Sequence, residues 1–188
     1  MSSSFEKQLK KVDQLIVHGK LKESYEIINE EIKKKEISKE EELRFLAFKS
    51  ELEFYFGNFD ESIRLADVIL KKSKGLNNLL TSVDALTWKA ISCFFNGRTG
   101  DCLKTIEKGK TTISSAKNLP EKAFAKRKAQ FQTWQAFIVI HLGDFDKGLE
   151  LAKEASSFAE KSEYKNAISL NLLIIAECYA KLGENERC

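Results

Sequence analysis

The stretch His141–Leu149 reads HLGDFDKGL, and its pattern decides the fold of this chain. It predicts a helix that ends at Gly143, a turn, and a new helix that begins at once. Glycine adopts the left-handed conformation that closes a helix, and Asp144 can cap the helix that follows.

Similar phrases occur four more times along the chain. Their central glycines are residues 19, 57, 97 and 183, so that successive copies, with Gly143, are 38, 40, 46 and 40 residues apart. One helix-turn-helix unit per step of this length is typical of an α-solenoid. The sequence therefore predicts an all-α chain, a right-handed α-solenoid of about nine helices in antiparallel pairs.

We expect one array over residues 1–188. Its repeats are predicted at about 4–37, 38–76, 80–117 and 118–163, followed by one extra helix at 165–182. Ser38 and Glu41 have the spacing of a capping box and predict the first helix of the second repeat. Asn118 and Pro120 predict a helix with Asn at the cap and Pro in its first turn.

The composition is that of a soluble globular protein, with 43% hydrophobic and 31% charged residues. The net charge of +3 is too small to imply nucleic acid as a partner, and the basic run at residues 122–128 is expected to be a solvated helix face. No stretch has the length and apolar character of a signal peptide or a membrane span. The four cysteines lack metal-type spacing, which favours a reduced, cytoplasmic setting.

Small residues recur at two fixed distances from the repeated glycine. The positions seven before it and five after it hold Val12, Ser50, Ala90, Ala136, Ala176, Ser24, Ser62, Cys102 and Gly148. This pattern resembles the tetratricopeptide repeat (TPR) family over essentially the whole chain. The repeats are longer than usual and mostly lack the family's terminal proline, so the chain looks like a divergent branch of that family.

The resemblance implies that the chain binds a segment of another protein in a concave groove lined by the first helix of each repeat. Chaperone-binding members hold a carboxylate with Lys and Asn four residues apart. The matching pairs here are Leu9 and Asp13, Ala47 and Glu51, and Thr87 and Ile91. We therefore expect a protein or peptide partner that is not bound by a carboxylate clamp.

Aromatic residues dominate the helix face that this register places in the groove. The expected groove residues are Arg44, Phe48, Glu51, Tyr55, Trp88, Ile91, Phe95, Trp134, Phe137 and His141. They form one column of Phe48, Trp88 and Trp134 and another of Tyr55, Phe95 and His141. Such a groove suits an apolar or amphipathic segment, although the same rings could instead pack the first helices against each other.

The sequence lacks the residue patterns that would indicate an enzyme active site. It has two distant histidines, no cluster of metal-ligating residues, and no glycine-rich phosphate loop. We expect a non-enzymatic scaffold without metal or cofactor.

The last predicted helix is apolar almost all round, and such a helix requires cover on every side. The sequence stops soon after the fifth turn begins, so we expect cover from a continuation of the chain or from another molecule. Leu170, Leu173 and Ile174 are the candidate surface for a homodimer. The alternatives to a peptide-binding scaffold are thus a self-assembling structural module or the sensor or scaffold part of a larger regulator.

Overall fold

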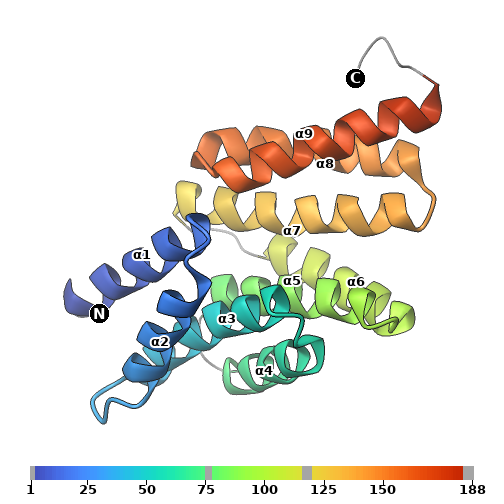
Figure 1. Cartoon of the computed structure of the whole chain (residues 1–188). Helices are drawn as coiled ribbons and strands as arrows, with labels where there is room; N and C mark the ends of the chain where they lie inside the picture. Colours follow the sequence, from blue (N-terminus) through green and yellow to red (C-terminus); the bar gives the residue numbers. More distant parts are fainter. Residues whose placement is uncertain (1–2, 75–77, 116–119, 184–188) are drawn as a thin grey trace. The chain divides into compact units, whose positions relative to one another are not determined.

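The structure is a computed structural model that describes residues 3–74, 78–115 and 120–183. These residues form nine α-helices and no strand (Figure 1). The helices are α1 (Ser3–Val17), α2 (Leu21–Ile32), α3 (Lys39–Tyr55), α4 (Phe59–Lys72), α5 (Leu79–Phe95), α6 (Thr99–Ser115), α7 (Glu121–His141), α8 (Phe145–Ser162) and α9 (Lys165–Leu182). The predicted all-α architecture is confirmed.

Two compact units divide the chain, residues Met1–Cys102 and Leu103–Cys188. In the first unit α1, α2, α3, α4 and α5 pack on their neighbours in sequence, and α3 also contacts α1 and α5. In the second unit α8 packs between its neighbours α7 and α9, which also contact each other. The boundary falls inside α6, within the repeat expected at 80–117, and the predicted single array remains a prediction.

The repeated turn has the geometry that its glycine predicts. At Gly57 the backbone φ is +80°, the Gly57 N–H donates to Phe54 O at 2.9 Å, and the Asn58 N–H donates to Glu53 O at 2.8 Å. These two bonds define a Schellman motif, which satisfies carbonyls that the end of α3 would otherwise leave without partners. The copies at Gly19, Gly97 and Gly143 repeat the same pair of bonds.

The helix starts follow local sequence signals in two cases and depart from them in one. Asp144 accepts a hydrogen bond from Lys147 N at 3.0 Å, and Ser38 and Glu41 form the predicted capping box. Pro120, by contrast, stands before the first helical residue, because α7 begins at Glu121 and Pro120 has an extended ψ of 122°. The predicted cap, Asn118, lies outside the described residues.

Small residues lie where the two helices of a pair touch. The hydroxyl groups of Ser50 and Ser62 each donate to the other residue's carbonyl oxygen, at 2.9 and 2.8 Å, and both residues are fully buried. In the second unit, a Cβ added to Gly148 would lie 2.1 Å from Cγ2 of Ile140. Larger side chains would separate these helices, so the physical reason for the repeated small positions is borne out.

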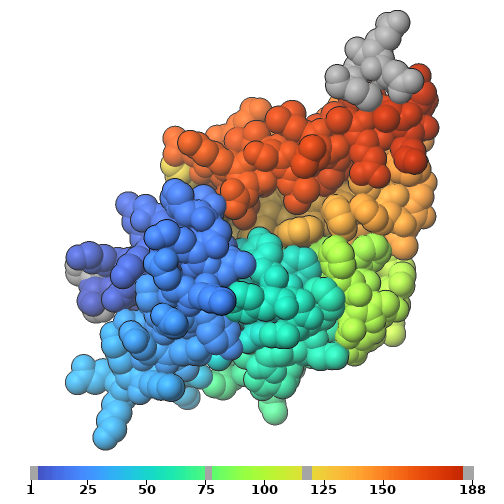
Figure 2. All heavy atoms as spheres, in the orientation of Figure 1, coloured from blue at the N-terminus to red at the C-terminus, as the bar shows by residue number. Residues whose placement is uncertain are grey.

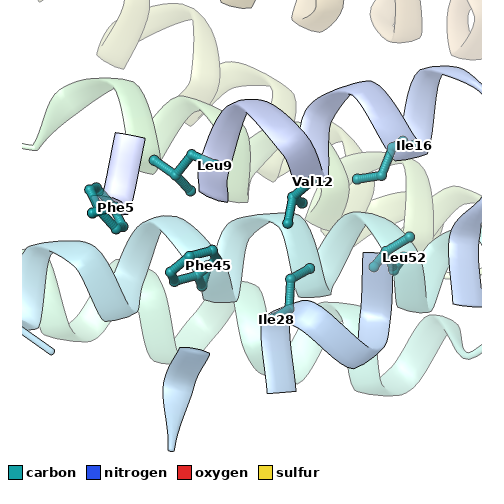
Figure 3. Packing of buried hydrophobic residues seen from close by; sticks show 7 residues of the cluster. All are labelled: Phe5, Leu9, Val12, Ile16, Ile28, Phe45 and Leu52. Atoms are coloured by element: carbon teal, nitrogen blue, oxygen red, sulfur yellow. The ribbon is translucent and has the colours of Figure 1, made fainter. Parts of the chain in front are cut away.

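The core of the first unit shows how the first helices bury their apolar faces. Side chains of α1 point toward Phe45 and Leu52 of α3 and toward Ile28 of α2 (Figure 3). Phe5 meets Phe45 edge to face with ring centroids 5.4 Å apart. This packing fixes α3, whose C-terminal end leads into the candidate site.

Candidate functional site

Aromatic side chains gather where α3 and α5 end in the first unit. Tyr55 is the last residue of α3, Phe56 is its C-cap, and Phe95 is the last residue of α5. They are 41%, 39% and 47% exposed, because the helices stop there and the turns leave these rings uncovered. With Phe59, the first residue of α4, they form a surface that we call the aromatic edge.

A second layer of rings supports the aromatic edge from within the unit. Phe54 lies at its centre, with ring centroids 5.4 Å from Tyr55 and 5.6 Å from Phe95. Phe59 stacks on Phe95 at 5.7 Å, and Trp88 contacts both Phe54 and Tyr55 at 5.6 Å. Rings in mutual contact lose little freedom when a partner binds, which suits a recognition surface.

The structure corrects part of the predicted groove. Trp88 is 1% exposed and Ile91 is fully buried, so neither side chain can meet a partner at this surface. The register placed both on the groove face, but the rings of Phe54 and Tyr55 lie against Trp88. Glu51 is also buried and accepts a hydrogen bond from the Tyr55 hydroxyl group.

The other predicted residues of α3 face the first repeat. Phe48 is half-buried and packs against the core between α1, α2 and α3. The Arg44 guanidinium donates to Glu6 Oε1 at 2.6 Å and lies over the ring of Phe5. Of the residues predicted in this unit, Tyr55 and Phe95 are therefore brought together as an exposed pair, with Phe54 between them.

The second unit has its own aromatic row on α7. Trp134 and Phe137 are half-buried with ring centroids 5.7 Å apart, and Phe137 lies 4.1 Å from the exposed ring of His141. His141 Nδ1 lies 2.8 Å from Phe137 O, so the imidazole is held against its own helix. His18 makes the equivalent contact with Gln14 O.

Sequence reasoning missed Phe56 and Phe59 as members of this surface and Phe54 as the buried ring beneath it. Phe59 lies two residues after the turn glycine, at the position that Phe145 holds in the phrase HLGDFDKGL. Phe56 directly precedes that glycine, and a C-cap residue projects outward at a turn. Those two signals could have identified the edge, whereas the position of Phe54 depends on packing.

Carboxylates surround the aromatic edge. The Tyr25 hydroxyl group donates to Glu53 Oε1 at 2.7 Å, and Asn58 Nδ2 donates to Glu53 Oε2 at 2.8 Å. Burial, followed by the hydrogen bond to Glu53, raises the pKa of Tyr25 to about 12. Burial and the neighbouring Glu51 raise the pKa of Tyr55 as well.

A hollow of about 360 Å³ adjoins Phe59. It is lined by Gly57, Asn58, Phe59, Asp60, Glu61 and Asn96. Asp60 accepts a hydrogen bond from Asn96 Nδ2 at 2.8 Å, and its side chain is 83% exposed. Arg64 donates two hydrogen bonds to Glu61, which lower the pKa of that carboxyl group.

The outer face of α9 is the other apolar surface of note. Leu172 and Leu173 are 61% and 68% exposed, and the red atoms of α9 form an uncovered surface in Figure 2. The candidate oligomer surface is corrected at Ile174, which is buried with Ala136 and Cys178, while Leu170 is half-buried against the same core. Leu173 is therefore the predicted residue that remains in the candidate oligomer surface, and Leu172 is added to that surface.

The basic run of α7 interacts with α8 and with residues near the start of α9. Lys128 Nζ lies 3.0 Å from Glu154 Oε1 and 4.0 Å from the ring centroid of Phe158. Lys122 pairs with Glu163, and Lys126 lies over the ring of Tyr164. These cations therefore help to hold unit 2 together.

The described part of the chain lacks the features of two further classes of site. No helix there is long and apolar enough to cross a membrane. Residues 3–74, 78–115 and 120–183 also contain no group of three or more His, Cys, Asp or Glu side chains placed to hold a metal ion.

Solved structures of repeat proteins are similar to this chain. A Podosopora anserina protein described as a kinesin light chain with nearly identical TPR-like repeats gives a TM-score of 0.60 at 16% identity, over 98% of this chain and 89% of that one. A variant of that protein with one substitution gives the same TM-score. The apo form of RapI gives 0.57 at 13% identity, over 97% of this chain and 62% of that one.

The chain matches no family model. No curated protein sequence matches it. The likeness to the solved structures shows that the chain has the TPR-like fold that its repeats predict.

Proposed function

We propose that this chain, whose fold is that of TPR-like repeat proteins, is a non-enzymatic scaffold that binds a segment of a partner protein. The aromatic edge carries the proposal. Tyr55 and Phe95 are exposed over the buried rings of Phe54 and Trp88, and Phe56 is exposed beside the ring of Tyr25. Exposed aromatic clusters on soluble proteins mark interaction sites, and aromatic side chains dominate binding energy at such sites.

In this proposal the predicted groove residues have different roles in binding. Tyr55 and Phe95 contact the partner, Trp88 and Glu51 support Tyr55 from within the unit, and Ile91 is part of the buried core. Arg44 and Phe48 belong to the same first-helix face, nearer the first repeat, and Trp134, Phe137 and His141 form a separate contact row in the second unit. The partner is not held by a carboxylate clamp, since the clamp positions carry other residues.

We also propose a cytoplasmic location. Cys93, Cys102 and Cys178 are buried free thiols, and burial raises the pKa of each. Thiols of this kind serve as small apolar core residues and persist in a reducing compartment. Localisation of the tagged full chain by microscopy tests this, and a secreted chain would contradict it.

Photo-cross-linking tests the scaffold proposal. A photoreactive phenylalanine analogue placed at position 95 should cross-link a protein partner in cells, and mass spectrometry identifies the adduct. In affinity capture, the double variant Tyr55→Ala plus Phe95→Ala should lose that partner, whereas Leu142→Ala, at an exposed turn position of the second unit, should retain it. If the double variant retains every partner, the aromatic edge is not the binding surface.

The exposed leucines of α9 favour a second candidate, self-assembly as a homodimer. Leu172 and Leu173 project from the uncovered face of this helix. Sedimentation velocity should then show dimers that become monomers in the double variant Leu172→Glu plus Leu173→Glu, while Val17→Glu leaves them intact. A chain that is monomeric at high concentration rules out this candidate.

A further inference from the structure

We propose that the partner segment carries an arginine or lysine beside an apolar residue, with the cation in the hollow next to Phe59 and the apolar side chain on the aromatic edge. This inference rests on the proposed function and specifies the chemistry of the partner. It follows from the juxtaposition of carboxylates and exposed rings at the start of α4.

The lining of the hollow has the chemistry of a cation site. Among the described residues that line it, Asp60 and Glu61 are carboxylates, Asn58 and Asn96 supply amide groups, and none is basic. Asp60 is the more available carboxylate. Its Oδ1 accepts one bond from the neutral Asn96 amide, and the guanidinium of Arg98 comes no closer than 3.8 Å. A second hydrogen-bond donor can therefore reach it from solvent.

The two guanidinium groups near the hollow already pair with carboxylates. Arg98 donates two hydrogen bonds to Asp101, at 3.0 and 3.1 Å, and Arg64 donates two to Glu61, at 2.6 and 2.7 Å. Buried Glu53 adds a further negative charge behind Asn58. The four nearby carboxylates, of Asp60, Glu61, Glu53 and Asp101, therefore outnumber the three basic side chains of Arg64, Arg98 and Lys49.

The rings supply the second half of the site. Phe59 lines the hollow and stacks on Phe95 with an interplanar angle of 22°, so the two rings form one continuous wall. A guanidinium group over such a ring gains a cation–π attraction in addition to its pairing with a carboxylate. Phe95 extends the wall to Phe54 and Tyr55, where an adjacent apolar side chain can bury itself.

Selection from a display library tests the inference. The full chain is presented with random octapeptides, and the enriched peptides are synthesised for fluorescence anisotropy. They should share a basic residue next to an apolar one, and their affinity should fall as salt rises. Asp60→Asn should weaken them by about fivefold to tenfold, because it removes one charge partner.

Asp146→Asn is the matched control, because Asp146 follows Gly143 as Asp60 follows Gly57. It should leave the affinity unchanged, and thermal melts should show each variant folded. Enriched peptides that lack a basic residue, or that bind Asp60→Asn like the unaltered chain, overturn the inference. If peptides of that kind still lose affinity for the Phe95→Ala variant, the scaffold proposal stands and only the cation inference falls. If the chain enriches no peptide at all, both the scaffold proposal and the cation inference are overturned.

Discussion

Gly148 shows how one residue sets the distance between two helices. It lies inside α8, where glycine is normally unfavourable, but a Cβ there would approach Ile140 Cγ2 to 2.1 Å and Ala136 O to 3.6 Å. We expect Gly148→Ala to lower the free energy of unfolding by about 1–3 kcal/mol, since overpacking outweighs the gain in helix propensity. Urea denaturation followed by circular dichroism measures this.

Gly100 provides the control for that substitution. It also lies in a helix, in the first turn of α6, but a Cβ there would meet nothing within 4 Å. Gly100→Ala should leave the stability unchanged or raise it by up to about 1 kcal/mol. If both alanines change stability in the same direction, close packing is not the reason for Gly148.

Burial of the Asn171 side-chain amide is costly. It is fully buried on the inner face of α9, and neither its Oδ1 nor its Nδ2 has a hydrogen-bond partner in the described part of the chain. Replacing such a group with an apolar side chain of similar size removes its desolvation penalty, about 1–3 kcal/mol. Asn171→Leu should therefore raise the melting temperature, and Asn166→Leu, at an exposed position of the same helix, serves as the control. A lower melting temperature would mean that the amide group is stabilising.

At the scale of helices, Tyr25 and Glu53 join α2 to α3. The Tyr25 hydroxyl group donates to Glu53, which also accepts from Asn58 at the following turn. Because the folded state raises the pKa of Tyr25 from 10.0 to about 12, the stability from this contact is complete below pH 10 and is lost as the pH rises toward 12.

Tyr25→Phe tests that dependence. The variant has no phenol to ionise, so its free energy of unfolding should fall less steeply between pH 10 and pH 12 than that of the unaltered chain. Urea titrations at a series of pH values measure both slopes. Identical slopes would show that ionisation of Tyr25 does not oppose folding, whatever free energy of unfolding the variant loses at neutral pH.

Turns were predictable from the sequence, whereas the exposure of the rings was not. A Schellman turn such as that at Gly57 depends on a few adjacent residues, so the phrases at Gly19, Gly57, Gly97 and Gly143 each identified a real turn. Trp88 has the correct helical register for a groove residue, yet the rings of Phe54 and Tyr55 from α3 cover it. Register specifies the face of a helix, but burial depends on the side chains of its neighbours.

For the molecule as a whole, each compact unit contains one tryptophan, Trp88 in the first and Trp134 in the second. Repeat arrays are stabilised mainly by contacts between neighbouring helices, so damage to one part should spread weakly to the rest. The Trp88→Phe background leaves Trp134 to report on the second unit, and the Trp134→Phe background leaves Trp88 to report on the first. Gly148→Ala should therefore shift the urea midpoint more in the Trp88→Phe background than in the Trp134→Phe background. Each background is compared with itself, which removes the cost of the tryptophan replacement. Equal shifts in both reporters would show instead that the two units unfold as one cooperative body.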